Sequence, residues 1–219
     1  MKLEGARIAF LGDSITEGVG TSEQSNRYAD LLAKNYGVIP FNYGISGTRF
    51  AEQIVKENET CDFDAFTSRF DKMEKDVDCV VVFGSTNDYG HGDAPIGIPS
   101  DRTAFTFYGA CHTLMQGLLE IYVGKPVVFL TPLHRTNDEK PSDDVRKNGK
   151  GLEPLVTHRN IIKEIAEIYA LPVLDLYAMS GIQPNNAIVA EALCPDGLHP
   201  NDAGHVILSE RIAHFLLGL

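Results

Sequence analysis

The chain has 219 residues, of which 43% are hydrophobic and 22% are charged, values that are ordinary for a globular protein. Its formal net charge of −11 argues against nucleic acid or an anionic membrane as a main partner, because both bind basic surfaces. No apolar stretch approaches the roughly 20 residues of a membrane span, and residues 1–7 are too charged for a signal peptide.

The cysteines indicate a reducing compartment. They are scattered without a CxxC pair, so neither a zinc site nor a disulfide framework is expected. The four are Cys61, Cys79, Cys111 and Cys194. Cys79 opens an apolar run and is expected to be a core residue. We therefore expect a cytoplasmic protein, and the sequence carries no signal for an oligomeric state.

Short apolar runs predict five strands that alternate with helix-length segments. The expected strands cover 8–11, 38–43, 79–83, 126–130 and 172–176. The third run has no polar alternation, so we expect a central parallel strand that is buried on both faces. Strands that alternate with helices predict a parallel sheet with helices on both sides. No repeat or linker divides the chain, which predicts one domain over residues 1–219.

Amphipathic patterns predict the helices between these strands. They cover 27–36, 103–123, 153–169 and 201–217, with one or two further helical pieces within 50–70. Gly37 is the expected C-cap of the first helix. The Gly- and Pro-rich stretch 86–100 is expected to lack regular structure, and 136–151 is expected to be a polar surface loop. The segments 86–100 and 133–152 are candidates for lids over a site.

The first predicted strand runs directly into a Gly-Asp-Ser turn that ends at Ser14. Its hydroxyl is a candidate nucleophile, because open parallel sheets bind ligands at the carboxyl ends of their strands. Alternatively, this serine and the aspartate before it only satisfy turn or helix-cap hydrogen bonds. The loops after the other strands favour the nucleophile, since they bring further polar residues to the same edge. These residues are Gly47, Asn87, Arg135 and His199.

Acyl transfer requires these residue types. A serine nucleophile needs a base, and His199 is the candidate. Asp196 precedes it by three residues in a turn, where a carboxylate can hydrogen-bond the imidazole and fix its tautomer. A developing oxyanion needs preorganised donors, which the backbone N–H groups of Ser14 and Gly47 and the side-chain amide of Asn87 can supply.

Four separated sequence blocks stand at the ends of predicted strands. They are Gly-Asp-Ser-Ile-Thr at 12–16, Asn-Tyr-Gly-Ile-Ser-Gly at 42–47, Gly-Ser-Thr-Asn-Asp at 84–88 and Asp-Gly-Leu-His-Pro at 196–200. Because it has these four blocks in this order, the chain resembles the SGNH hydrolase family of the GDSL esterase/lipase superfamily. The first block has Ile where the superfamily's name has Leu.

The resemblance implies a flavodoxin-like three-layer α/β/α sandwich with a five-stranded parallel sheet. It implies Ser14 as the nucleophile, His199 as the base and Asp196 as the third triad member. It also implies an oxyanion hole formed by Ser14, Gly47 and Asn87. Activities known for the family include esterase, lipase, thioesterase and carbohydrate deacetylase, none of which needs a metal or cofactor. We therefore expect a GDSL-type serine esterase.

The predicted loops suggest the class of substrate. The segments 86–100 and 133–152 are polar, glycine-rich and charged, whereas a long-chain lipase needs a broad apolar surface near its site. This favours a short acyl ester, such as an acetyl ester, of a polar alcohol such as a carbohydrate. Arg135 either recognises a substrate oxygen or carboxylate, or pairs with nearby acidic residues.

Two other functions remain as alternatives. A metal-dependent phosphoesterase uses similar Gly-Asp turns, but no Asp-Xaa-His follows a predicted strand, and His91 with Asp93 supplies only two candidate metal ligands. A non-catalytic ligand-binding module on the same fold is disfavoured by the complete set of catalytic residue types. Asp13 and Asp88 are expected to stabilise turns rather than to take part in chemistry.

Overall fold

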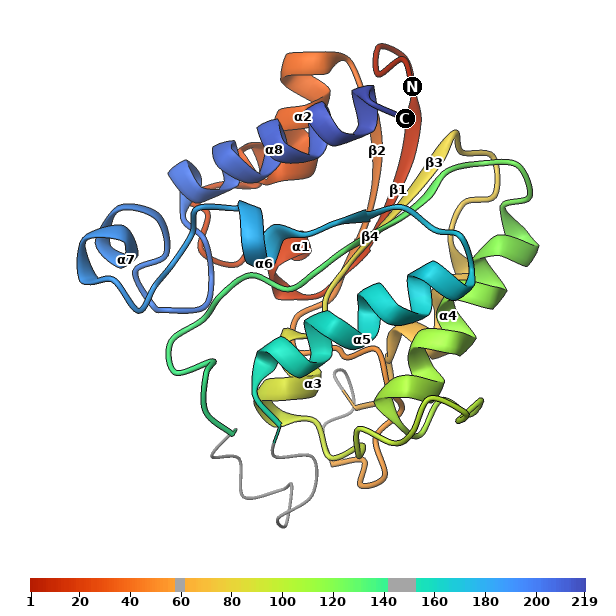
Figure 1. Ribbon diagram of the computed structural model, residues 1–219. Coiled ribbons are helices and arrows are strands. Elements are labelled where there is room, and N and C mark those ends of the chain that lie inside the picture. Colours follow the sequence, from red (N-terminus) through yellow and green to blue (C-terminus); the bar gives the residue numbers. More distant parts are fainter. Residues whose placement is uncertain (58–61, 142–152) are drawn as a thin grey trace.

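A five-stranded parallel sheet forms the centre of the computed structural model, which describes residues 1–57, 62–141 and 153–219. In the order β2–β1–β3–β4–β5, the strands are Ile39–Gly44, Arg7–Gly12, Cys79–Phe83, Val127–Leu130 and Val173–Leu174. Helices cover both faces of this sheet (Figure 1). The predicted α/β/α sandwich with five parallel strands is confirmed.

The two central strands place alternate side chains in two hydrophobic layers. Phe10 of β1 and Val81 of β3 belong to the layer on one face, and Leu11 and Val82 belong to the layer on the other. Every residue of β3 is buried. Burial on both faces explains why this strand is a continuous apolar run, as the sequence predicts.

Two pairs of long helices form the outer layers. On one face α2 (Tyr28–Tyr36) packs beside α8 (Asp202–Leu217), and on the other α4 (Phe107–Ile121) packs beside α5 (Leu155–Ile168) (Figure 1). Their bounds lie within a few residues of the predicted ones. α2 ends at Gly37, whose φ of 72° lies in the left-handed region that favours glycine.

The sequence patterns miss four short helices. They are α1 (Ser14–Glu17), α3 (Thr86–His91), α6 (Leu176–Met179) and α7 (Ala187–Leu193). A helix of one or two turns leaves almost no periodic signal, and three of the four instead begin at a side-chain cap, from Asp13, Asp175 and Asn186. The expectation that 86–100 lacks regular structure is wrong for the residues that form α3.

Tertiary contacts also override two local predictions. In the described part of 50–70, the helical residues are those of the 3₁₀ turn η2 (Phe66–Ser68) and the first residue of the 3₁₀ turn η3 (Phe70–Lys72). The rings of Phe50 and Phe66 pack together in this segment, with their centroids 5.0 Å apart. Strand β5 is shorter than the predicted 172–176, because the Asp175 side chain accepts a hydrogen bond from the Ala178 N–H and starts α6. A further 3₁₀ turn, η1 (Gln24–Asn26), precedes α2.

Parts of two predictions fall outside the described residues. The candidate lid at 133–152 lies partly outside them, and Cys61 lies wholly outside. Cys79, Cys111 and Cys194 are buried free thiols, and burial raises the pKa of Cys79 and of Cys194 to about 12. Across the described residues, no helix combines the length and the apolar character needed to cross a membrane.

Candidate active site

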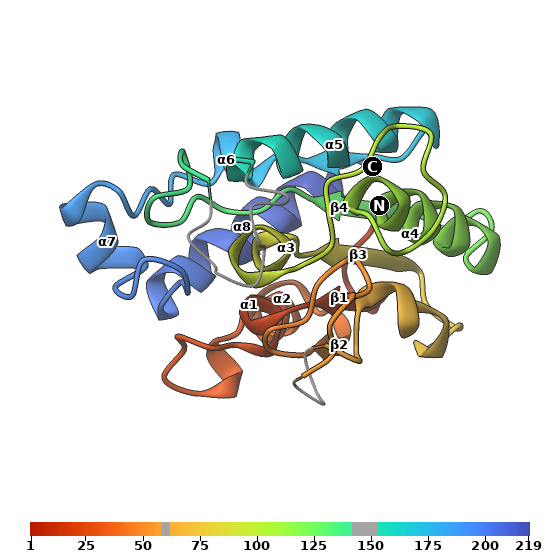
Figure 2. The same cartoon turned by 90° about the horizontal axis from the view of Figure 1, so that it is seen from below.

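The carboxyl ends of the strands meet at one edge of the sheet, which faces the viewer in Figure 2. Strands β1 and β3 are neighbours, and each leads into a short helix at this edge, α1 and α3. Ser14 is the first residue of α1, and Asn87 lies in the first turn of α3. The adjacent strands therefore bring these two residues, which are far apart in the sequence, to the same pocket.

Two glycines allow α1 to pack directly against the ends of β1 and β2. A Cβ atom on Gly12 would lie 1.8 Å from the Thr16 Oγ1 atom. A Cβ atom on Gly44 would lie 2.2 Å from the backbone nitrogen of Glu17. Neither position has room for a side chain, so these glycines fix where Ser14 sits relative to the sheet.

Ser14, His199 and Asp196 form a continuous chain of hydrogen bonds. The Ser14 Oγ atom lies 3.0 Å from His199 Nε2, and His199 Nδ1 lies 2.6 Å from Asp196 Oδ2. The second carboxylate oxygen accepts hydrogen bonds from the backbone N–H groups of Leu198, at 2.8 Å, and His199, at 2.7 Å. The turn that carries both residues thus holds the carboxylate against the imidazole.

The environment of Asp196 favours its ionised form. Partial burial raises the pKa of this carboxyl, but the backbone and side-chain hydrogen bonds from His199 and the one from Leu198 outweigh that effect, and the net pKa lies below the usual value. An ionised Asp196 accepts a hydrogen bond from the His199 Nδ1–H group. The lone pair of the neutral ring then lies on Nε2, directed at the Ser14 hydroxyl.

Two further segments bring hydrogen-bond donors beside Ser14. Gly47, in the loop after β2, has a φ of 76°, in the left-handed region that favours glycine. Ser85 has a φ of 80° and turns the chain from β3 into α3, which directs Asn87 inward. The Asn87 Nδ2 atom donates to the Thr48 carbonyl over 3.0 Å, which ties α3 to the loop that carries Gly47.

A pocket of about 350 Å³ opens beside the Ser14 hydroxyl. Its lining consists of Ser14, Val19, Ser46, Gly47, Asn87, His91, Arg135, Leu198 and His199. The structure therefore brings together five of the six site residues predicted from the sequence. The sixth, Asp196, lies behind the imidazole of His199 and contacts the pocket only through it.

Arg135 reaches the pocket from the segment after β4. Its Nη1 atom donates to the Thr86 carbonyl over 3.1 Å, and its guanidinium lies 5.4 Å from the centre of the Tyr89 ring. Burial lowers the pKa of Arg135, and electrostatic interactions with Tyr89 and with nearby carboxylates oppose that shift. The guanidinium is thus anchored at the start of α3 while Arg135 lines the pocket.

The two acidic residues beside the site point away from the pocket. Asp13 is 1% exposed and caps α1 through a 3.0 Å hydrogen bond from the Ile15 N–H. Burial, with a smaller contribution from the nearby Asp88 charge, raises the pKa of Asp13 to about 7. Asp88 accepts hydrogen bonds from the backbone N–H groups of Phe50 and Ala51, at 2.9 and 3.0 Å. Both contacts are those of turn-stabilising residues.

His91 also lines the pocket, although the sequence indicated only that it and Asp93 are two candidate metal ligands, too few for a site. Its Nε2 atom lies 3.0 Å from Asn87 Oδ1 and its Nδ1 atom contacts Arg49, while Asp93 accepts hydrogen bonds from the Ile54 and Val55 N–H groups. The His91 and Asp93 side chains therefore bind different groups of the protein rather than facing a common metal position. Within residues 1–57, 62–141 and 153–219, no three His, Cys, Asp or Glu side chains are grouped to hold a metal.

The chain matches a known protein family. A family model described as "GDSL-like Lipase/Acylhydrolase family" matches residues 10–207. The span includes every predicted site residue from Ser14 to His199. Among curated protein sequences, none matches this chain.

Solved structures have the same fold over nearly the whole chain. A protein from Lactobacillus plantarum is 32% identical, with a TM-score of 0.83 over 99% of this chain and 98% of that one. A lipase/acylhydrolase from Enterococcus faecalis is 23% identical, with a TM-score of 0.63 over 97% and 96%. A variant of an acetyl-xylooligosaccharide esterase from Geobacillus is 20% identical, with a TM-score of 0.61 over 99% and 96%.

Proposed function

Because this chain belongs to the GDSL-like lipase/acylhydrolase family, we propose that it is a serine esterase that hydrolyses a carboxylic ester through an acyl-enzyme. One observation carries the proposal. The Ser14 hydroxyl lies 3.0 Å from His199 Nε2, whose other ring nitrogen is held by the Asp196 carboxylate, at the wall of a pocket. A nucleophile in contact with an oriented base is the arrangement that acyl transfer needs.

The reaction follows from these contacts. His199 takes the Ser14 proton as Oγ attacks the ester carbonyl, and the resulting oxyanion accepts hydrogen bonds from the Ser14 and Gly47 backbone N–H groups and from the Asn87 amide. Protonated His199 then gives its proton to the alcohol as the ester C–O bond breaks. A water molecule, activated by the same imidazole, releases the acid and regenerates the hydroxyl.

A short acyl group on a polar alcohol is the substrate that we propose. The pocket measures about 350 Å³, and Val19 and Leu198 are the two aliphatic side chains among its lining residues. Two aliphatic side chains give a long acyl chain little surface to pack against, which favours a short acyl group such as acetyl. Arg135 supplies a charged donor for an oxygen of the alcohol, such as a carbohydrate hydroxyl. An acetyl-xylooligosaccharide esterase has the same fold, which is therefore compatible with such a substrate.

A matched series of p-nitrophenyl acetate, butyrate and octanoate tests the proposal with the purified protein. We expect turnover of the acetate to be fastest and Ser14→Ala to abolish it. A phosphonate ester should label Ser14 and no other serine. Wild-type turnover by Ser14→Ala refutes the mechanism, whereas faster turnover of the octanoate refutes only the short-acyl assignment.

A further inference from the structure

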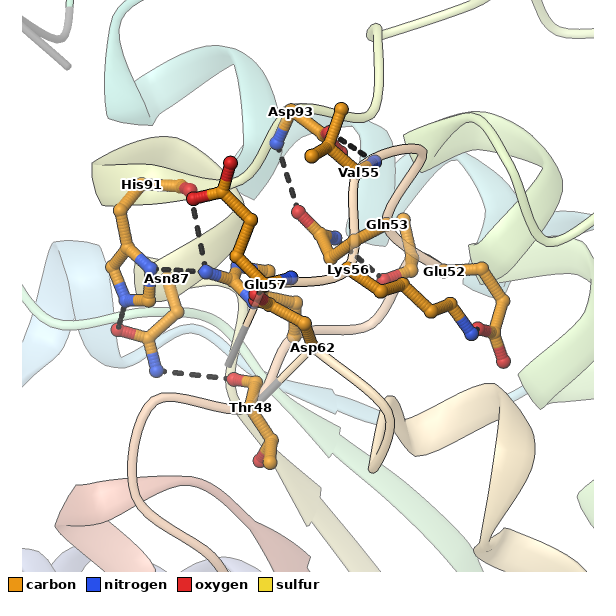
Figure 3. Close-up of polar contacts among 12 residues, drawn as sticks. Thr48, Glu52, Gln53, Val55, Lys56, Glu57, Asp62, Asn87, His91 and Asp93 are labelled. Atoms are coloured by element: carbon orange, nitrogen blue, oxygen red, sulfur yellow. Dashed lines mark hydrogen bonds and ion pairs between the residues drawn. The ribbon is translucent and has the colours of Figure 1, made fainter. Parts of the chain in front are cut away.

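The Asn87 side chain is held at both of its polar ends. Its Nδ2 atom donates to the Thr48 carbonyl over 3.0 Å, and its Oδ1 atom lies 3.0 Å from His91 Nε2 (Figure 3). Asn87 and His91 are four residues apart on α3, a spacing that places two side chains on the same face of a helix. The imidazole therefore lies directly against the amide that we assign to the oxyanion hole.

The second ring nitrogen of His91 faces a buried cation. The Arg49 side chain is fully buried, pairs with Asp62 over 2.6 Å, and contacts His91 Nδ1 with its Nη2 atom. A guanidinium has five N–H donors and no acceptor, so Nδ1 must accept in this contact. A neutral imidazole that accepts at Nδ1 carries its hydrogen on Nε2.

This tautomer fixes the orientation of the Asn87 amide. The His91 Nε2–H group donates to Oδ1, so the NH₂ group has to lie on the opposite side. One of its hydrogens goes to the Thr48 carbonyl and the other is left for the pocket. The flipped amide would set its oxygen against the Thr48 carbonyl oxygen, and it would present an acceptor instead of a donor to an oxyanion.

We propose that His91 is a positioning residue that keeps the Asn87 amide in its donor orientation, with Arg49 setting the tautomer of His91. The inference rests on the proposed esterase function, because it assigns a task to one of its oxyanion donors. The same contacts link the two segments that carry donors, since Arg49 follows Gly47 by two residues in the loop and also donates to the His91 carbonyl over 3.3 Å.

Replacing His91, rather than Arg49, tests this role, because loss of Arg49 would also remove its ion pair with the buried Asp62 carboxylate. In His91→Leu we expect kcat for p-nitrophenyl acetate to fall about tenfold or more, with KM changed by less than about twofold. His91→Gln should recover part of the loss, because its amide can still donate to Asn87. His214→Leu, an exposed exchange on α8, is the matched control and should leave kcat unchanged.

A double-mutant cycle separates positioning from direct contact with substrate. In the Asn87→Ala background, His91→Leu should cost less than about twofold in kcat, because the amide that it positions is already absent. A full, additive loss in that background overturns the inference. A loss that appears in KM rather than in kcat also overturns it, because His91 lines the pocket and would then be acting on the substrate itself.

A spectroscopic measurement tests the tautomer without any activity assay. The protein is labelled with ¹⁵N-histidine, and the His91 signals are assigned as those that disappear in His91→Gln. At neutral pH, we expect the ¹⁵N chemical shifts of the His91 ring to be those of the Nε2–H tautomer. An Nδ1–H ring or an imidazolium overturns the inference even in a fully active enzyme. Conversely, if Ser14→Ala retains wild-type turnover, the esterase mechanism fails while the tautomer assignment can still be checked.

Discussion

The buried carboxyl of Asp13 makes stability depend on pH in a direction opposite to that of a carboxyl whose pKa is lowered by folding. Its pKa rises from the usual 3.8 to about 7 because the charged form is desolvated. The unfolded chain ionises near pH 4 while the folded protein stays protonated, so this group's contribution to stability is complete below pH 4 and is lost as pH rises to about 7. At about 1.4 kcal/mol per pKa unit, the total is about 4 kcal/mol, of which about 3 kcal/mol falls between pH 5 and pH 8.

Asp13→Asn removes this titration and keeps the cap, because an asparagine oxygen can still accept from the Ile15 N–H. We expect the variant to gain about 3 kcal/mol relative to wild type between pH 5 and pH 8, measured by urea unfolding at half-unit steps. Asp76→Asn, a change at a side chain that is 91% exposed, controls for the loss of one negative charge. Parallel pH curves for wild type and Asp13→Asn would refute the argument.

Three further predictions concern the edge of the sheet. Asn87→Ala should lower kcat about 10²- to 10³-fold with little change in KM in steady-state assays, and an unchanged kcat removes it from the oxyanion hole. Gly44→Ala should destabilise the protein by about 1–3 kcal/mol in urea unfolding, because its Cβ would lie 2.2 Å from the Glu17 nitrogen, and a smaller effect shows that α1 can shift. Arg135→Met should raise KM for an acetylated sugar about tenfold but leave p-nitrophenyl acetate unaffected, and equal effects on both argue against contact with the alcohol.

The sheet could be predicted because its strands are short and largely apolar, and because long amphipathic helices separate most of them. The run from Cys79 to Phe83 matches β3 residue for residue. Ser14, Gly47, Asn87 and His199 could be placed together for a simple reason, since parallel strands send every following loop to the same edge. The order of the loops, rather than any single motif, made the site predictable.

The contacts that the sequence could not supply are those made between distant side chains. Without α3, the four-residue spacing of Asn87 and His91 has no geometric meaning, and a histidine near Asp93 suggests a metal instead. α3 is only six residues long, and it is held by the Asp88 carboxylate accepting from two backbone N–H groups that lie far away in the sequence. Such a helix depends on tertiary hydrogen bonds, so its own residues carry little trace of it.

The division of the site between the two ends of the chain has a consequence for its synthesis. The proposed nucleophile, Ser14, stands on α1 directly after the first strand, whereas His199 and Asp196 stand just before α8, which packs on α2. His199 follows Ser14 by 185 positions in the sequence, so a growing chain carries the proposed nucleophile long before its proposed base has been synthesised. The proposed site is complete only once the turn that carries Asp196 and His199 lies against Ser14.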